Sequence, residues 1–493
     1  MNEAEAKPAP SNRKFYLLVA AFLLAAALTG VFSARRGKSS VELWKEEMRA
    51  KGEKFTIAEL LPKRTGPATN RVEELVRLGK LLGSSSRALS TIEHFRYLSN
   101  GVAEAAWMRP KLGLSAAAPG TTGRGAPSSM VPYEWEDLAA EVAAMKTTLA
   151  EVHALLAVPD RDTGWDYQQR TPMPKCFVEK RHLAQWLAAA NTLALHERQP
   201  AQAVAHLTAL GDMLAWHDED FTIIGQMIRV AIGGMALHST WATMQAPGLT
   251  EAQLADLQAR WQALAIKPAF ARALEFERAG VGERIAATCS GEHSFVDIGA
   301  GMTGAGKIAD GAYGLAWRVF AAEADELYYL QLMQDQIGTV RKEARLRSWA
   351  DIQSDRAAIH AKVAALDTGR GRMLMVSRIA IPNLLNAGKT GTRYETFREL
   401  TVAALAVERF RRKHGRAPAS LSDLVPVFLP AVPVDWMDGK PLRYRLNPDG
   451  AYTLWSIGED LKDDGGDGSD AAPATRTTDI WDRKDALWPR PPP

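Results

Sequence analysis

The sequence has very few cysteines: Cys176 and Cys289 are the only two in 493 residues. Two thiols this far apart provide neither the ligands of a zinc ribbon nor the framework of a disulfide-rich small domain. Whether the two pair with each other stays open, because cysteine usage alone does not fix the redox compartment. Their scarcity excludes a fold that is held together by several disulfides.

An excess of charge of one sign is also lacking. The chain has 60 Lys and Arg residues against 57 Asp and Glu residues, and no long basic block stands out. Proteins that bind nucleic acid usually gather a basic surface that neutralises phosphates. We therefore predict no nucleic-acid partner.

A complete phosphate-binding motif is absent. GAGMTGAGKI at 299–308 has the glycine spacing of a dinucleotide loop and most of a P-loop. However, Ile308 follows Lys307, where a P-loop has the serine or threonine that ligates magnesium. We interpret the stretch as a flexible connection between helices and predict no bound nucleotide.

The usual catalytic motifs are missing too. Neither His-Glu-x-x-His nor Gly-x-Ser-x-Gly occurs. His217-Asp218-Glu219-Asp220 gathers residue types that bind metals, but four consecutive helical residues point in different directions, so a solvated helix end is predicted. We predict that the protein is not an enzyme, with a metal-dependent enzyme built on Asp218, Glu219 and Asp220 as an alternative.

The N-terminus, in contrast, holds a long apolar run. Phe15–Ala34 contains twenty residues without a charge, which at 1.5 Å per residue matches the roughly 30 Å core of a bilayer. We predict a single-pass signal anchor in the inner membrane at 15–34, with a short cytoplasmic tail at 1–14 and the body in the periplasm. A signal peptide cut after Ser33 is the alternative, and it exports the body as well.

Residues 35–390 show helical periodicity with loops between the helices. Apolar residues from Leu138 to Leu156 recur at intervals of four and three, which places them on one face of a helix. Residues 109–132 are rich in Gly, Pro and Ser, which predicts a long loop. Further helices are expected over Asp220–Met244, Thr250–Ala279, Leu315–Arg347 and Trp349–Ala365.

One part of this helical body resembles a repeat unit. His182–Asp220 predicts two amphipathic helices broken near Pro200, similar to one helical hairpin of the tetratricopeptide kind. No second copy follows at a fixed period. The hairpin suggests an alternative function, an exported helical-repeat scaffold that binds a protein partner at 182–210 and has no role in secretion.

The composition changes near residue 390, and a compact α+β domain is predicted over 391–493. Tyr394–Lys413 forms an amphipathic pattern that ends at His414-Gly415, a typical helix stop. Leu442–Leu446 and Tyr452–Ile457 flank the turn sequence Asn-Pro-Asp-Gly and predict a β-hairpin. The fold class expected for the whole chain is therefore mainly α with a small C-terminal α+β domain.

An acidic, glycine-rich segment follows the hairpin at Ser456–Asp482. Carboxylates held at contact distance repel by roughly 4 kcal/mol per pair in a surface-like dielectric, so a folded loop needs a cation. Calcium accepts six to eight oxygen ligands in a forgiving geometry, whereas zinc would favour the Cys and His that are missing nearby. The alternative is a disordered acidic linker.

The order of motifs in this region resembles the C-terminal globular domain of the major pseudopilin of type II secretion systems. That family has a helix ending near His-Gly-x-x-Pro, a Ser-Leu-x-x-Leu segment, and later Tyr-x-x-x-Ser-x-Gly-x-Asp before a closing Asp-Ile. The resemblance covers about Glu395–Asp482. The matching stretches are His414–Pro418, Ser420–Leu424, Asp435–Tyr444, Tyr452–Asp460 and Asp479–Ile480.

The resemblance implies a calcium site, because the last loop of that family binds calcium and the ion stabilises the subunit. Carried over residue by residue, Asp460 and Asp479 are expected to bind through their side chains and Ile457 through its carbonyl. Four further candidates have no counterpart in the family and follow from their chemistry alone: Asp463, Asp464, Asp467 and Asp470.

The helical body, with RAKGEKFTIAELLP at 49–62, also resembles that of anchored envelope proteins of bacteria with large genomes. Together these features predict a non-enzymatic envelope protein with a calcium-stabilised, pseudopilin-like C-terminal domain. Its expected role is binding or assembly linked to type II secretion or pilus-like machinery, with an envelope or secretion-system protein as partner.

Overall fold

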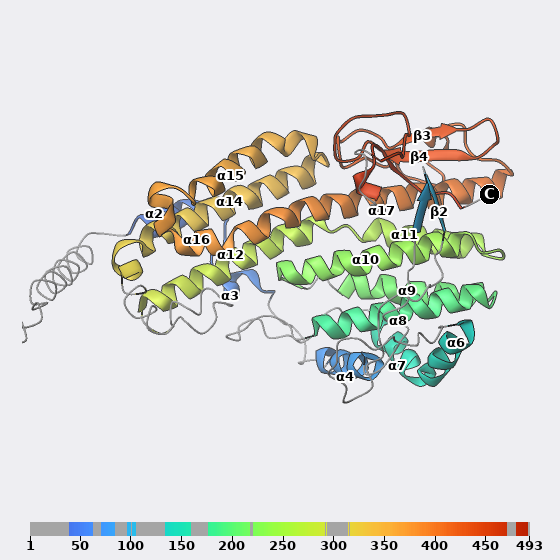
Figure 1. The fold of residues 1–493 in the computed structure, drawn as a ribbon, viewed down its shortest axis with the longest axis horizontal. Coiled ribbons are helices and arrows are strands. Elements are labelled where there is room, and N and C mark those ends of the chain that lie inside the picture. The colour runs from blue at the N-terminus through green and yellow to red at the C-terminus, as the bar shows by residue number, and fades with distance from the viewer. Residues whose placement is uncertain are drawn as a thin grey trace, which may run out of the picture. The chain divides into compact units, whose positions relative to one another are not determined.

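The computed structural model describes residues 39–62, 71–83, 96–99, 101–104, 134–158, 176–216, 220–290, 292, 314, 316–470 and 480–491. This part of the chain is mostly helical, with a small antiparallel sheet of three strands near the C-terminus (Figure 1). The predicted fold class is confirmed at that level.

Three expectations fall outside the described residues: the anchor at 15–34, the loop at 109–132 and the glycine run at 299–308. Of the helices that the structure describes, none is long and apolar enough to cross a membrane.

The chain forms two compact units. The first unit contains residues 1–61, 277–335 and 358–383, and the second contains residues 62–276, 336–357 and 384–493. Four helices contribute residues to both units: α12 (Lys267–Ser290), α14 (Ala322–Leu346), α15 (Gln353–Ala365) and α17 (Pro382–His414).

The first unit begins with two short helices whose ends are satisfied by side chains. Ser39 caps α2 (Ser40–Ala50), and Thr56 forms a reciprocal capping box with Glu59 at the start of α3 (Ile57–Leu60). The Ile57 amide then donates to Glu283 on α12 over 2.9 Å. Further along the chain, the unit contains η4 (Gly369–Met373) and α16 (Met375–Ala380).

The helices of the second unit are centred on α8 (Phe177–His196). A run of small residues, Ala188–Ala190, is buried on α8, and α8 packs against α9 (Pro200–Trp216), α10 (Ile223–Met244) and α4 (Arg71–Gly83). Figure 1 shows α8, α9 and α10 side by side. The predicted hairpin of two helices broken near Pro200 is confirmed.

Glycine sets the close approach of α4 to α8. A Cβ added at Gly79 would lie 2.4 Å from the Glu179 Cβ, which no real side chain tolerates. The Trp186 indole donates to the Leu82 carbonyl over 2.8 Å at the same crossing. A larger residue at position 79 would therefore push the two helices apart.

Two predicted helices are each broken in the structure. The stripe from Leu138 to Leu156 belongs to α6 (Trp135–Ala144) and α7 (Lys146–Leu156), because the backbone leaves the helical conformation at Met145. The segment Thr250–Ala279 contains α11 (Glu251–Ala263) and the beginning of α12. Apolar periodicity continues across both breaks, so the pattern alone did not show them.

The long helix α17 (Pro382–His414) begins well before the predicted start at Tyr394, with a proline that suits the first turn of a helix. It ends at Gly415, whose φ of 69° is left-handed, as the sequence predicted. A short helix, η5 (Leu421–Leu424), follows and has a capping box between Ser420 and Asp423.

The C-terminal sheet has the order β3-β4-β5 and is antiparallel throughout. The predicted hairpin is confirmed as β3 (Arg443–Leu446) and β4 (Tyr452–Ser456), with Arg443 opposite Trp455. The third strand, β5 (Ala486–Leu487), pairs with β4 on its other side and was not predicted.

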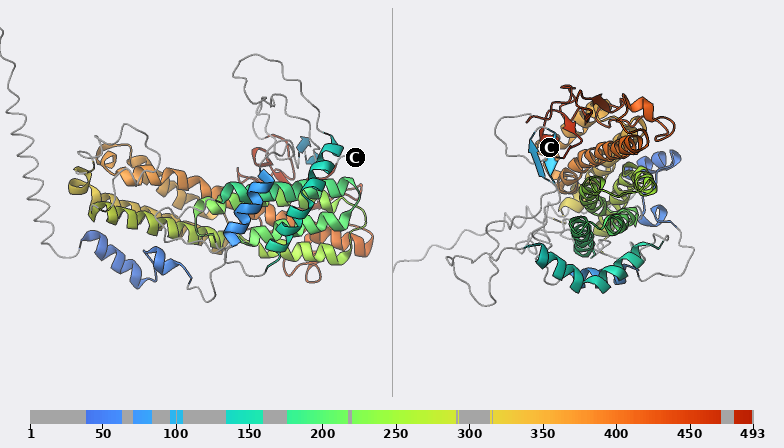
Figure 2. Two further views of the ribbon diagram at one scale, coloured as in Figure 1. Left: turned by 90° about the horizontal axis from the view of Figure 1, so that it is seen from below. Right: turned by 90° about the vertical axis from the view of Figure 1, so that its right-hand side faces the viewer.

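A second, unpredicted hairpin lies in a region expected to be helical. It consists of β1 (Arg96–Ser99) and β2 (Val102–Glu104). The Ala103 amide donates to the Arg490 carbonyl and the Arg490 amide donates to the Gly101 carbonyl, each over 3.0 Å. The hairpin therefore lies beside the C-terminal residues (Figure 2).

Candidate functional site

The residues that follow β4 form a loop that folds back on the end of the chain. We call residues 457–470 the acidic loop. The Lys484 amide donates to the Ser469 carbonyl and the Asp485 amide donates to the Asp467 carbonyl, each over 3.0 Å. Gly458 has a φ of 72°, and a Cβ there would lie 2.6 Å from the Lys484 carbonyl oxygen. The described part of this segment is thus folded, in contrast to the alternative of a disordered acidic linker.

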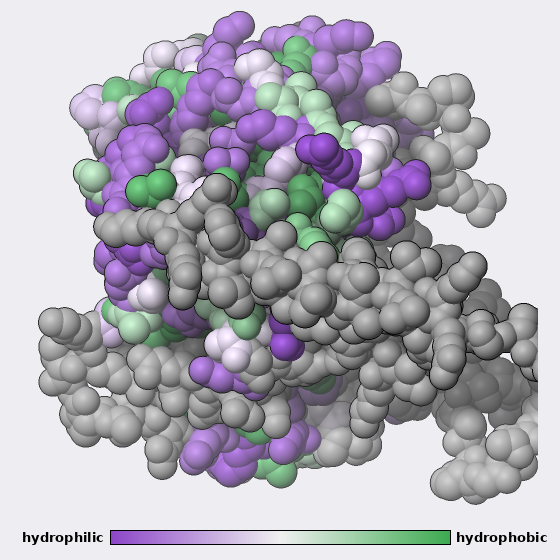
Figure 3. Space-filling model, turned by 90° about the vertical axis from the view of Figure 1, so that its left-hand side faces the viewer, coloured by the Kyte–Doolittle hydropathy of each residue, from purple (hydrophilic) through white to green (hydrophobic). Residues whose placement is uncertain are grey.

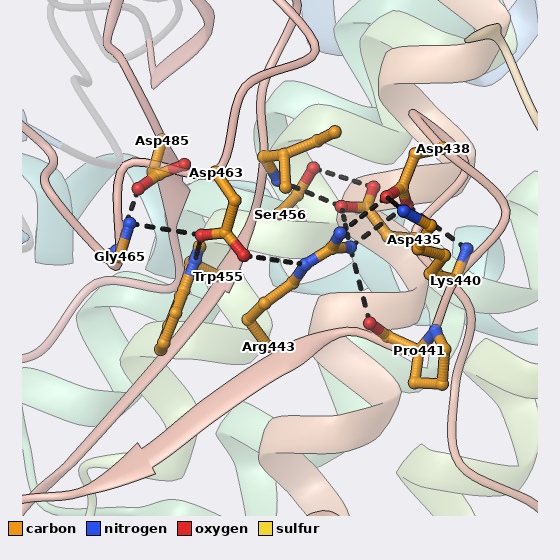
Figure 4. A network of polar contacts seen from close by, with 12 residues as sticks. Asp435, Asp438, Lys440, Pro441, Arg443, Trp455, Ser456, Asp463, Gly465 and Asp485 are labelled. Carbon is orange, nitrogen blue, oxygen red and sulfur yellow. Dashed lines mark hydrogen bonds and ion pairs between the residues drawn. The ribbon is translucent and has the colours of Figure 1, made fainter.

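Asp435 fixes the point at which the loop leaves the sheet (Figure 4). Its buried carboxylate accepts hydrogen bonds from the Ser456 hydroxyl at 2.8 Å, the Ile457 amide at 2.9 Å and the Met437 amide at 3.0 Å. Burial raises the pKa of Asp435, while these donors and Arg443 favour the ionised form. Asp435 therefore holds the turn before β3 against the end of β4.

Arg443 on β3 extends this network to the acidic loop. Its guanidinium contacts Asp435 at 3.1 Å, Asp438 at 2.5 Å and Asp463 at 3.4 Å. Figure 4 shows the guanidinium between the two turn carboxylates on one side and Asp463 on the other. One cation thus neutralises carboxylates from three places in the chain.

Asp485 also holds the acidic loop in place, through hydrogen bonds to the loop backbone. It is fully buried, and its carboxylate accepts from the amides of Gly466 at 2.8 Å, Asp467 at 3.0 Å and Asp464 at 3.3 Å. Burial raises the pKa of Asp485, and the three amides oppose that effect. The loop backbone is therefore wrapped around this carboxylate.

Three of the predicted metal ligands are paired with protein cations. Asp463 accepts from the Trp455 indole at 3.0 Å in addition to its contact with Arg443. Asp467 contacts Lys484 at 2.8 Å, and this hydrogen bond lowers the pKa of Asp467 to about 2. Asp470 lies 3.4 Å from Arg483. The charge repulsion expected in this loop is thus partly relieved by arginine and lysine.

The remaining predicted ligands differ from those three. Within the described chain, no lysine, arginine or histidine pairs with the side chains of Asp460 or Asp464, and Asp460 accepts only from the Lys462 amide at 3.0 Å. Ile457 is buried at the start of the loop. Asp479 lies outside the described residues. The described residues contain no group of three His, Cys, Asp or Glu side chains close enough to hold a metal.

The acidic run near residue 217 is placed only in part, because the structure describes Asp220 but not residues 217–219. Asp220 is buried, lies 3.4 Å from the Lys180 ammonium and accepts from the Thr222 hydroxyl at 2.9 Å. The prediction of a solvated helix end is therefore wrong at Asp220, which stabilises the start of α10. Cys176 is buried and Cys289 is exposed, and both are free thiols.

Sequence reasoning missed the residues that organise the loop. Asp435 and Arg443 lie inside the quoted motif Asp435–Tyr444, and their separation of eight residues across a tight turn was a signal that could have been used. Asp485 gave no signal, because its partners are backbone amides of a loop about twenty residues earlier.

The chain was compared with protein-family models, with curated proteins and with solved structures, and none of the three comparisons gives a match.

Proposed function

We propose that this protein is a non-enzymatic, membrane-anchored envelope protein whose C-terminal region is a pseudopilin-like module stabilised by calcium. In this proposal the module takes part in binding or assembly beside a type II secretion or pilus-like machine, on the periplasmic side of the inner membrane. The anchor is the apolar segment at 15–34.

The observation that carries the proposal is that the motif residues contact one another. The Tyr444 hydroxyl donates to the Pro418 carbonyl over 2.8 Å, which joins the end of the Asp435–Tyr444 motif to the segment after α17. Asp435 begins that motif and accepts from Ser456 in the next one. Motifs that are separated in the sequence thus contact one another, as expected if they belong to one folded module.

The candidate metal ligands fit calcium in part. Every candidate offers oxygen, the ligand atom that calcium prefers. Asp460 and Asp464 lack a cationic partner within the described chain, whereas Asp463, Asp467 and Asp470 have one. We therefore narrow the proposed ligand set to Asp460, Asp464, Asp479 and the Ile457 carbonyl. A bound calcium ion would supply positive charge to carboxylates that form no close ion pair with a lysine or arginine of the described residues.

Thermal unfolding with calcium and with a chelator tests the calcium site. The full chain should melt at a higher temperature in calcium, and Asp460→Ala or Asp479→Ala should abolish that difference. Asp449→Ala is the matched control, because Asp449 lies in the exposed turn between β3 and β4 and, among the described residues, accepts only from the Ala451 amide. Identical melting curves with and without chelator would refute the calcium site.

The apolar segment at 15–34 favours a role beside the secretion machine over a role as a subunit of its filament. A pseudopilin has a glutamate five residues into its membrane helix, whereas the apolar segment here begins Phe-Tyr-Leu-Leu-Val. The alternative of a helical-repeat scaffold gains no support, since α8 is buried by other helices of its own unit. Cross-linking of the full chain in native membranes tests the role: capture of secretion-system subunits supports it, and their absence among the products contradicts it.

A further inference from the structure

One end of the first unit carries exposed arginine and apolar residues on the same short segment. We call Gly369–Ala380, which contains η4 and α16, the basic segment. Arg370 and Arg372 are exposed, Met373 is 50 % exposed and Ile379 is 39 % exposed. Exposed apolar side chains next to arginine suit a bilayer interface, where the apolar groups are buried and the guanidinium groups face the headgroups.

The charges on this segment are only partly neutralised. Asp367 is the nearest carboxylate in the sequence, and it lies 3.1 Å from Arg378. The Asp367 carbonyl accepts from the Arg372 guanidinium over 2.9 Å. No carboxylate of the described residues forms an ion pair with Arg370 or Arg372. Their positive charge is therefore available to a partner outside the protein.

The first turn of α14 connects the basic segment to the beginning of α2. Asp325 accepts from the amides of Val376 at 2.8 Å and Ser377 at 3.0 Å. Two residues earlier, Glu323 accepts from the Ser40 amide at 2.8 Å. Figure 1 shows α2 and α16 at the same end of α14. The basic segment and the start of α2 thus lie at one end of the first unit.

The start of α2 is close in sequence to the predicted anchor. Five residues, 35–39, separate Ala34 from Ser40. An extended chain covers at most about 3.5 Å per residue, so Ser40 lies within roughly 20 Å of the end of the anchor. This places the same end of the first unit near the bilayer surface.

We propose that the basic segment binds the surface of the anchoring membrane. Arg370 and Arg372 contact the phosphates of anionic phospholipids, and Met373 enters the interface between headgroups and acyl chains. Guanidinium groups suit phosphate oxygens, and basic side chains close to a bilayer surface are attracted by anionic lipids. Among the coloured residues of Figure 3, which views the molecule from the left-hand side of Figure 1, hydrophilic residues cover most of the surface and hydrophobic residues lie in smaller groups among them. The inference rests on the membrane anchor of the proposed function.

Site-specific photo-cross-linking in the full chain tests the proposal. The protein is reconstituted in vesicles of phosphatidylcholine with or without phosphatidylglycerol, and a benzophenone amino acid replaces one residue at a time. Position 373 reports on the basic segment, and position 25 reports on the anchor. Position 427 is the control, since Val427 is apolar and 67 % exposed but belongs to the second unit.

We expect lipid adducts at positions 25 and 373 and none at 427. The double substitution Arg370→Glu with Arg372→Glu should reduce the adduct at 373 to phosphatidylglycerol roughly thirtyfold, because each basic residue contributes on the order of 1 kcal/mol. The adduct at 25 should not change. Lys413→Glu with Arg416→Glu is the matched control, because both residues are exposed and lie in the second unit.

Three negative results are distinguishable. Adducts at 25 without adducts at 373 would overturn membrane binding by the basic segment and leave the anchor intact. No adducts at either position would overturn the anchor and this inference with it. Adducts at 373 that ignore both lipid charge and the two arginine substitutions would overturn the role of the arginines.

Discussion

At the scale of single residues, Asp435 is the group on which most of the C-terminal network depends. Asp435→Asn keeps the shape of the side chain but removes the charge that faces Arg443 and replaces an acceptor oxygen with a donor. Breaking a buried, hydrogen-bonded ion pair costs about 3–5 kcal/mol. We expect a loss of this order in the free energy of unfolding, measured by urea denaturation.

Asp438→Asn provides the comparison for that experiment, because Asp438 contacts the same guanidinium but is less buried. Its effect should be clearly smaller. Equal losses of unfolding free energy in the two variants would mean that the stabilisation comes from the contact with Arg443. The buried acceptor at the end of β4 would then contribute little.

A second prediction at this scale concerns two histidines between α7 and α9. The His153 Nε2 and His206 Nδ1 atoms lie 2.9 Å apart. Burial, and then the neighbouring His153, lowers the pKa of His206 to about 4. Burial also lowers the pKa of His153, and Asp212 on α9, which lies 2.7 Å from Arg260 on α11, partly opposes that effect.

The sign of the pH dependence follows from this lowered pKa. In the unfolded chain a histidine has a pKa near 6.5, so between about pH 4 and pH 6.5 the unfolded state binds more protons. The free energy of unfolding should therefore fall as the pH decreases through this window, by roughly 3 kcal/mol from this group. His206→Gln should flatten the dependence, and an unchanged slope would contradict the assignment.

At the scale of elements, the break between α11 and α12 is set by a residue on a third helix. The Glu395 carboxylate on α17 accepts from the amides of Ile266 at 2.5 Å and Lys267 at 3.1 Å, at the point where α12 begins. Its other oxygen accepts from Arg398 at 2.7 Å. A buried carboxylate thus satisfies amides that a helix start leaves without partners.

Glu395→Ala should lower the free energy of unfolding by about 3–5 kcal/mol, because it leaves two buried amides without their acceptor and removes one of the two carboxylates that pair with Arg398, the other being Glu399. Glu395→Gln keeps an acceptor oxygen and should cost clearly less. Chemical denaturation of both variants checks the order, and equal losses would contradict a capping role.

Short sequence patterns correctly predicted those elements whose formation depends on neighbouring residues. The α8–α9 hairpin and the β3–β4 hairpin follow from apolar periodicity and from a turn sequence, and both are present. The break before α12 depends on Glu395, more than a hundred residues away in the sequence, and β5 is only two residues long. The same limit applies to the site: the acidic loop was evident, but its closure around Asp485 depends on contacts that no short pattern encodes.

At the scale of the whole molecule, the C-terminal residues belong to the same compact unit as the helices that precede them. The Trp241 indole on α10 donates to the Pro489 carbonyl over 2.8 Å, and Gln258 on α11 donates to the Phe428 carbonyl over 2.7 Å. A chain that ends at residue 389 should therefore lose amide protection in α10 and α11.

Hydrogen exchange followed by mass spectrometry measures that protection. The comparison is the full chain carrying Asp449→Ala, which leaves the C-terminal residues in place. Unchanged protection of α10 and α11 in the truncated chain would show that the helices fold without the C-terminal region.

The position of β5 has a consequence for how the protein is made. The third strand, the acceptor for the α10 indole and the partner of the β1–β2 hairpin all lie between residues 486 and 490. During synthesis these residues follow the helices of the second unit, so this unit reaches its final form only after residue 490 has left the ribosome. A product that terminates before residue 486 lacks both the closing strand of the sheet and the carbonyl that accepts from the α10 indole.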